Sequence, residues 1–176
     1  MDVAIGDSTL YRFDGLDRFP LIHGITTRDP ALPGEGDINI LGRLPREDAI
    51  ANRRAWAETL GIDAEALVAG RQVHGIRVAR VDASDRGRGA FNIEDAIPQT
   101  DGLITQEPDV PLIIYTADCV PALIYDPVEH ALGLAHAGWR GTVGNIAGSI
   151  VAAMQAEFGS RPEDLIVRLG PSIGPC

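Results

Sequence analysis

The feature that most constrains the fold is a series of short apolar segments in the second half of the chain. Buried strands are predicted for DGLIT, VPLIIYTADCV, PALIYDP and ALGLAHAG, at residues 101–105, 110–120, 121–127 and 131–138. Short, nearly continuous apolar runs bounded by turn residues are typical of strands covered on both faces. Less regular apolar alternation predicts strands at 67–75 and 76–82, and a final strand is expected at 164–170.

Two segments have the apolar spacing of helices. The first begins at Pro45 and continues to Leu60, with Gly61 as its stop signal. Arg53 falls on its apolar stripe, which requires a buried carboxylate or an anionic ligand for the guanidinium. The second follows a glycine-rich turn after residue 138 and ends at Gly159; its apolar residues are Ile146, Ile150, Val151, Met154 and Phe158. The polar, glycine-bearing residues 83–99 are expected to form a long surface loop.

Composition indicates one globular domain, because the 176 residues are 45% hydrophobic and contain no repeat or linker. The 15 Lys and Arg residues against 25 Asp and Glu give a net charge of -10, which disfavours nucleic acid and anionic membranes and favours a small-molecule partner. The start of the chain lacks a secretory signal, and no apolar run of roughly 20 residues is present, so a soluble cytoplasmic protein is expected. Two cysteines, Cys119 and Cys176, do not make a disulfide framework.

Three segments place a potential metal ligand at the end of a predicted buried strand: QVHG with His74, TADC with Cys119 and LAHAGWRG with His136. Two imidazoles and a thiolate suit zinc, and three protein ligands with an open fourth position are typical of catalytic sites. The spacing alone is weak evidence, because no short motif brings two ligands onto one element, and each residue alone is compatible with ordinary packing. Asp118 is expected either to orient a ligand or only to end its strand.

The strand, glycine-rich turn and helix start around residues 136–146 also predict an anion-binding site. Free backbone N–H groups at a helix start attract anions, and Arg140 would assist them; the alternative for Arg140 is a surface salt bridge. Trp139 is expected to be a packing residue. His23 is a weaker candidate for the site, and His130 is expected in a solvated turn.

Taken together, the motifs resemble a known family. HGITTR, DINILG, NRRAWAETLG, QVHG, TADCVPALIYDP, LAHAGWRGTVGNI and LGPSIGPC occur in the order seen in the laccase-domain family, also called the multicopper polyphenol oxidoreductase or purine nucleoside phosphorylase family. The resemblance covers residues 23–176, and TADC and HAGWRG are its most specific parts. It implies a single mixed α/β domain, with a mixed central sheet and flanking helices, similar to the cytotoxic-necrotizing-factor-like cysteine hydrolase fold. Family members continue after the GPC motif, so residues 1–176 are expected to lack C-terminal segments.

The resemblance also implies a zinc ion held by His74, Cys119 and His136. Similar proteins convert adenosine, inosine, guanosine or methylthioadenosine and phosphate into the free base and a sugar 1-phosphate, and they deaminate adenosine. For such a reaction we expect phosphate near Arg140 and the backbone around Gly141. Arg53 and Asn39 are further candidate contacts.

Three other functions stay open at this point. A metal-free Cys/His hydrolase would use Cys119 as nucleophile and His136 as base on an amide of a peptidoglycan precursor or a protein side chain. A copper-dependent polyphenol oxidase needs more histidines than the four present, although copper could occupy the His/Cys site. A domain that senses nucleosides or binds a partner would keep the site without turnover.

Overall fold

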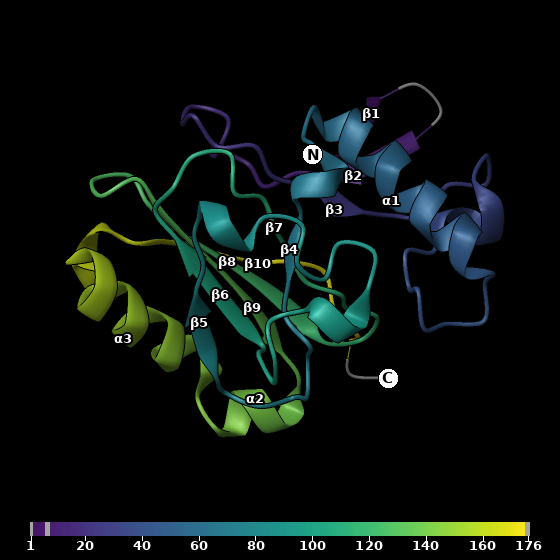
Figure 1. Cartoon of the computed structure of the whole chain (residues 1–176). Helices are drawn as coiled ribbons and strands as arrows, with labels where there is room; N and C mark the ends of the chain where they lie inside the picture. Colours follow the sequence, from purple (N-terminus) through teal and green to yellow (C-terminus); the bar gives the residue numbers. More distant parts are fainter. Residues whose placement is uncertain (1, 6–7, 175–176) are drawn as a thin grey trace. The chain divides into compact units, whose positions relative to one another are not determined.

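The computed structural model describes residues 2–5 and 8–174 (Figure 1). Backbone contacts divide the chain into an N-terminal unit, Met1–Ala64, and a C-terminal unit, Glu65–Cys176. Strands and helices together confirm the mixed α/β class, while the expectation of a single domain stays a prediction. The last two residues of the LGPSIGPC motif, Pro175 and Cys176, lie outside the described residues.

The N-terminal unit combines a small antiparallel sheet with one helix. The sheet has the order β1-β2-β3, and its strands are Asp2–Ile5, Ser8–Tyr11 and Ile25–Thr26. Sequence reasoning missed these strands, because each is only two to four residues long and lacks a clear alternation of apolar and polar residues. Helix α1, Arg46–Leu60, agrees with the prediction, except that Pro45 is its N-cap and not its first helical residue.

The C-terminal unit is built on a five-stranded mixed sheet. Its order is β10-β8-β9-β6-β5; β5 and β6 are parallel and the other neighbours are antiparallel. The strands are β5 Val78–Arg80, β6 Gly102–Thr105, β8 Val120–Asp126, β9 Ala131–Ala137 and β10 Ile166–Leu169. A separate parallel pair consists of β4, Val68–Ala69, and β7, Leu112–Ile113.

One strand prediction is wrong in extent. Residues 110–120 were expected to form one buried strand, but the strand β7 contains only Leu112 and Ile113, and Thr116 to Asp118 are exposed. Beyond Ile113 the backbone leaves the ladder, so the apolar composition of this segment does not correspond to a continuous strand. The predicted strand at 67–75 is likewise reduced to β4.

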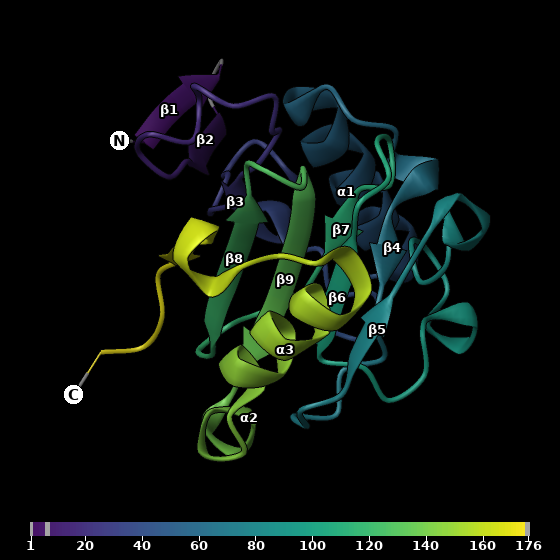
Figure 2. The same ribbon diagram turned by 90° about the vertical axis from the view of Figure 1, so that its left-hand side faces the viewer.

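The second predicted helical segment forms two helices. Helix α2, Trp139–Val143, begins directly after β9, and helix α3, Ile146–Phe158, follows Asn145, whose φ of 66° breaks the helical path. Helix α3 packs along the sheet (Figure 2), and its apolar face joins a core cluster. The residues of that cluster are Ile104, Ala122, Ile124, Ala131, Ala135, Ile146, Ile150, Met154 and Phe158. None of the helices among the described residues is long and apolar enough to cross a membrane.

A second, smaller apolar cluster unites residues of β4, β6 and the neighbouring loops. It consists of Val68, Val81, Ile97, Leu103 and Val110. Ile97 belongs to the segment predicted as a surface loop, so this loop contributes a side chain to the core. Short 3-10 helices complete the structure at Pro33–Gly36, Ala64–Ala66, Ala83–Asp85, Ile93–Asp95 and Pro162–Asp164.

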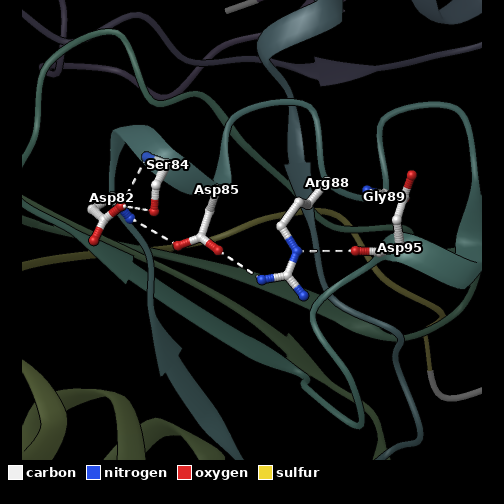
Figure 3. Close-up of polar contacts among 6 residues, drawn as sticks. All are labelled: Asp82, Ser84, Asp85, Arg88, Gly89 and Asp95. Atoms are coloured by element: carbon white, nitrogen blue, oxygen red, sulfur yellow. Dashed lines mark hydrogen bonds and ion pairs between the residues drawn. The ribbon is translucent and has the colours of Figure 1, made fainter.

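The loop between β5 and β6 is held by its own polar side chains (Figure 3). Asp82 accepts a hydrogen bond from the Ser84 amide, and Asp85 accepts one from the Asp82 amide, which together form a capping box. Arg88 lies between Asp85 Oδ1, at 2.7 Å, and the carbonyl oxygen of Asp95, at 3.0 Å. These contacts give a defined conformation to a segment whose composition alone is typical of an irregular loop.

Candidate metal centre

One end of the five-stranded sheet brings together three residues from distant parts of the sequence. In the antiparallel pair β8 and β9, Val120 is paired with Ala137, so Cys119 lies beside the end of β9 that carries His136. Strand β5 begins at the same end because it runs parallel to β6, and the loop that contains His74 leads into it. Helix α2 lies at this end of the sheet (Figures 1 and 2).

The three side chains form a compact cluster. The potential ligand atoms of His74, Cys119 and His136 all lie within 4.8 Å of one another. The two imidazole rings meet edge to face, with their centroids 4.7 Å apart and an interplanar angle of 81°. A tetrahedral zinc ion holds nitrogen and sulfur ligands roughly 3.4–3.6 Å apart, so a closing movement of about 1 Å would bring the three atoms to coordinating distance. The cluster can therefore bind a metal ion.

Gly138 makes room for this cluster. A β-carbon at residue 138 would lie 2.8 Å from Cδ2 of His74, 3.2 Å from Sγ of Cys119 and 3.6 Å from Cε1 of His136. Any other side chain would therefore occupy the space in which the three side chains meet. Gly138 is also the N-cap of α2, with φ -71° and ψ 168°, so the close approach and not the backbone conformation requires glycine here.

Helix α2 packs against the loop of His74 through Gly141. A β-carbon at residue 141 would lie 2.9 Å from the carbonyl oxygen of Gly75 and 3.6 Å from that of His136. Gly141 is buried, and this packing fixes the start of α2 beside the cluster. The participation of its backbone in phosphate binding stays a prediction.

Asp101, which sequence reasoning missed, lies behind the cluster and is 1% exposed. Its Oδ1 is 2.9 Å from Nδ1 of His136 and accepts a hydrogen bond of 2.9 Å from the His74 amide. Its Oδ2 accepts hydrogen bonds from the amides of Val73, at 3.0 Å, and Gly75, at 2.9 Å. The only sequence signal was an acidic residue at the start of an apolar strand, and Asp-Gly there is read more readily as a turn.

These partners determine the charge state of Asp101. Burial raises the pKa of its carboxyl group, whereas the hydrogen bonds from His136 and from the amides of Gly75, Val73 and His74 lower it, and the net pKa is below the ordinary value. A buried negative charge therefore lies directly behind two members of the cluster.

The loops of His74 and Cys119 are connected by a side-chain amide. Gln72 Nε2 donates to the carbonyl oxygen of Tyr115, and the Tyr115 amide donates to Gln72 Oε1, both at 2.8 Å. These two hydrogen bonds take the place of backbone pairing between strands, because β7 ends before Tyr115. On its other side, the same loop is tied to Ile97 by a β-bridge with Gly70.

Arg140 and Asp118 are both exposed to solvent, and each lies near a cluster residue in the sequence. The guanidinium carbon of Arg140 lies 5.2 Å from the centroid of the Trp139 ring. Trp139 is 71% exposed, so the prediction that it is a packing residue is wrong. The backbone carbonyl of Asp118 accepts a hydrogen bond from Ile173, whereas Asp101 provides the carboxylate that contacts a cluster histidine.

Arg53 and Asn39 belong to the N-terminal unit. Arg53 is 3% exposed, and its Nε donates to the carbonyl oxygen of Ile38 at 2.8 Å. The carboxylate or anionic partner expected for its guanidinium stays a prediction. Asn39 is exposed, and its Oδ1 accepts from the Leu41 amide. Their contact with substrate stays a prediction.

The remaining histidines have other surroundings. His23 is buried in the N-terminal unit, where its Nε2 accepts a hydrogen bond of 3.0 Å from the Phe13 amide. His130 is exposed in the turn between β8 and β9, as predicted.

The fold and the cluster together define a mixed α/β protein with a candidate His-Cys-His metal centre. The sequence model of the family described as multi-copper polyphenol oxidoreductase laccase matches residues 45–176, which include all three cluster residues. The chain therefore belongs to this family, as its motifs predicted.

Several similar proteins have the name purine nucleoside phosphorylase. The protein YlmD of Geobacillus stearothermophilus is 47% identical over 131 residues, which cover 74% of this chain and 48% of the relative. YlmD of Bacillus subtilis is 42% identical, over 73% of this chain and 47% of the relative. The chain thus spans about half the length of these relatives.

Solved structures agree with the fold. The crystal structure of YlmD from Geobacillus stearothermophilus has a TM-score of 0.78 and 43% identity, and the match covers 81% of this chain and 53% of that one. The hypothetical protein YfiH of Bacillus licheniformis has a TM-score of 0.87 and 33% identity, over 98% of this chain and 65% of that one.

Proposed function

We propose that this chain carries the metal centre of a purine nucleoside phosphorylase, with zinc as the metal and His74, Cys119 and His136 as its ligands. The convergence of these three side chains within 4.8 Å is the observation that carries the proposal. The names of the similar YlmD proteins supply the reaction class. Two imidazoles and a thiolate match the ligand preference of zinc, and three protein ligands leave one position for water or substrate.

The proposed reaction transfers a sugar from a purine to phosphate. A phosphate oxygen forms a bond to the anomeric carbon, the bond from that carbon to the purine nitrogen breaks, and the departing base takes up a proton. Catalysis then requires stabilisation of an oxocarbenium-like sugar and of a leaving base, so that positioned charges matter more than a covalent nucleophile. Adenosine, inosine, guanosine and methylthioadenosine are the proposed substrates.

Arg140 is the residue we propose for binding phosphate. The chain has a net charge of -10, so an anionic substrate requires a local cation. Arg140 is exposed and lies two residues after Gly138, the residue whose missing β-carbon leaves space for the cluster. A guanidinium can hold two phosphate oxygens at once, which orients as well as attracts them. Backbone amides near Gly141, together with Arg53 and Asn39 of the N-terminal unit, are further proposed contacts.

Zinc bound at this cluster would supply Lewis acidity and would activate water, and on this basis we propose adenosine deamination as a second activity. The chain itself contributes the position of the ligands. Gly138 keeps the space between them open, and His136 is held from behind by a buried carboxylate.

The test is to incubate the purified chain with adenosine or inosine, with and without phosphate, and to separate the products by chromatography. We expect adenine or hypoxanthine, with ribose 1-phosphate, only when phosphate is present, and inosine from adenosine if deamination also occurs. Cys119→Ala and His136→Ala should lose turnover and zinc together, whereas His130→Ala, in an exposed turn, should keep both. A Cys119→Ala protein that retains zinc and full activity would contradict the proposal.

A second candidate is a metal-free amide hydrolase that acts on a peptidoglycan precursor or a protein side chain. The arrangement of Cys119, His136 and Asp101 favours it, because a nucleophile, a base and a carboxylate that orients the base occur in this order. Zinc analysis and alkylation distinguish the two. Protein prepared without added metal should contain about one zinc per chain and resist iodoacetamide at Cys119 under the first proposal, and should contain none and react readily under the second.

Two weaker functions are outcomes of the same tests. Copper in place of zinc with phenol oxidation would indicate oxidase chemistry, although the cluster contains only two of the four histidines. Nucleoside binding without any product would indicate a sensing domain.

A further inference from the structure

We propose that Asp101 is the positioning residue of this centre: one buried carboxylate sets the ring tautomer of His136 and the loop conformation of His74. The inference rests on the proposed metal site and adds to it a residue that does not itself coordinate. Asp101 comes directly before β6, whose first residue, Gly102, is paired with Ala135 of β9. The register therefore places Asp101 beside His136.

The hydrogen-bonding capacity of the carboxylate is fully used. Its two oxygens take four partners, which are Nδ1 of His136 and the amides of Val73, His74 and Gly75. Three of these are backbone N–H groups, whose hydrogen bonds stabilise the ionised carboxylate, and an ionised carboxylate can only accept. Its fourth partner must then be a donor as well, and Nδ1 of His136 carries the proton.

This assignment determines what His136 offers to the cluster. In a neutral imidazole with its proton on Nδ1, Nε2 keeps its lone pair. A ring fixed in this way presents Nε2 as the ligand atom, and a carboxylate behind a ligand histidine also makes the ring more basic. The backbone adds a second restraint, because the His136 amide donates to the carbonyl oxygen of Asp101 at 2.8 Å.

The same carboxylate shapes the loop of His74. His74 has a φ of 60°, in the left-handed region that residues with a β-carbon rarely adopt. Three successive amides, from Val73 to Gly75, point to one carboxylate, which resembles the backbone nests that bind anions. Here the anion is a side chain of the protein, and it compensates for an unfavourable backbone conformation at a ligand.

Such support is needed because two of the three potential ligands, His74 and Cys119, lie outside the strands. His74 is exposed in a loop, and Cys119 follows an irregular segment, whereas His136 is in β9. Asp101 connects the loop of His74 to the histidine on the rigid strand. Removing it should loosen two of the three ligands together.

The test compares Asp101→Asn with Asp126→Asn. Asp126 is a matched control: it is fully buried, its Oδ1 accepts hydrogen bonds from the amides of Val128 and Glu129, and it lies at the end of β8 opposite to Cys119. Asparagine keeps the shape of aspartate, but its NH2 group replaces one oxygen and therefore faces two of the four donors. At the Oδ2 position this group would leave the amides of Val73 and Gly75 without an acceptor. At the Oδ1 position only the His74 amide loses its acceptor, because His136 can move its proton to Nε2, so we expect this second arrangement.

Two measurements decide the outcome. Competition with a chelating dye should show that Asp101→Asn binds zinc about 10- to 100-fold more weakly than the wild type, as is usual for residues that support metal ligands, and that Asp126→Asn does not. The imidazole ¹⁵N resonances of the metal-free wild-type protein should show a proton on Nδ1 of His136, and a shift toward Nε2 protonation in Asp101→Asn.

Zinc affinity within twofold of the wild type in Asp101→Asn, or an unchanged His136 tautomer, would overturn the inference. An equal loss of affinity in both variants would also overturn it, because it would indicate only general destabilisation. If the wild type itself binds no zinc, the proposed metal function fails, while the tautomer of the metal-free protein still decides the role of Asp101.

Discussion

Replacing Gly138 by alanine adds one methyl group at the meeting point of the three potential ligands. The backbone of residue 138, with φ -71° and ψ 168°, accepts alanine without strain, so α2 should still form. The new β-carbon would lie 2.8 Å from Cδ2 of His74 and 3.2 Å from Sγ of Cys119. Carbon atoms in contact are roughly 3.5–4.0 Å apart, so the His74 ring has to move by about 1 Å.

The size of the effect follows from this displacement. Zinc-ligand distances are confined to within about 0.2 Å, so a ring displaced by about 1 Å cannot keep its bond without strain elsewhere. Forcing a methyl group into a filled space costs roughly 1–3 kcal/mol. At about 1.4 kcal/mol per tenfold, the zinc dissociation constant should rise about 5- to 150-fold.

The assay is competition between the protein and a chromophoric chelator, with Gly174→Ala as the control. A β-carbon at residue 174 meets no atom within 4 Å, so this variant should bind zinc as the wild type does. Circular dichroism of both variants should match the wild type. Zinc binding by Gly138→Ala within twofold of the wild type would refute the reasoning, because the three side chains would then have to meet elsewhere.

Three further predictions concern phosphate, the loops and pH. Arg140→Ala should raise the KM for phosphate by roughly 10- to 150-fold in steady-state kinetics, the value of a charge-assisted hydrogen bond, with a smaller effect on nucleoside KM; an unchanged phosphate KM would contradict its role. Gln72→Glu places an acceptor against the Tyr115 carbonyl and should lower the free energy of unfolding by about 1–3 kcal/mol and weaken zinc binding; denaturant titration and chelator competition check this. The pKa of His23 lies below its ordinary value of about 6.5, mainly because the ring is buried. As the pH drops below about 6.5, the unfolded chain therefore takes up a proton before the folded chain does, and the free energy of unfolding falls. His23→Gln keeps an acceptor for the Phe13 amide, and between pH 7.5 and 5.5 it should lose less stability than the wild type; an equal loss would contradict this assignment.

Sequence periodicity predicted the elements that have a clear apolar pattern. Helices α1 and α3 and strands β6, β8, β9 and β10 occur close to their expected positions. Periodicity failed at 110–120, where apolar residues continue but Tyr115 pairs with the side chain of Gln72 and not with a strand. A contact between residues 43 positions apart leaves no local signal.

The candidate site shows the same limit. The cluster was expected because TADC and HAGWRG resemble family motifs, while spacing alone gave little support. Asp101 was missed, because its four partners come from a loop and a strand whose proximity depends on the sheet register. Gly138 was expected only as the last residue of the strand 131–138, although its main effect is to leave space for three side chains.

X-ray absorption at the zinc edge, on protein prepared without added metal, tests most directly whether His74, Cys119 and His136 form a metal centre. We expect about one zinc per chain, with nitrogen or oxygen neighbours at about 2.0–2.1 Å and one sulfur at about 2.3 Å, and the sulfur shell should be absent in Cys119→Ser. Protein without bound zinc, or a zinc ion without a sulfur neighbour in the wild type, would contradict it.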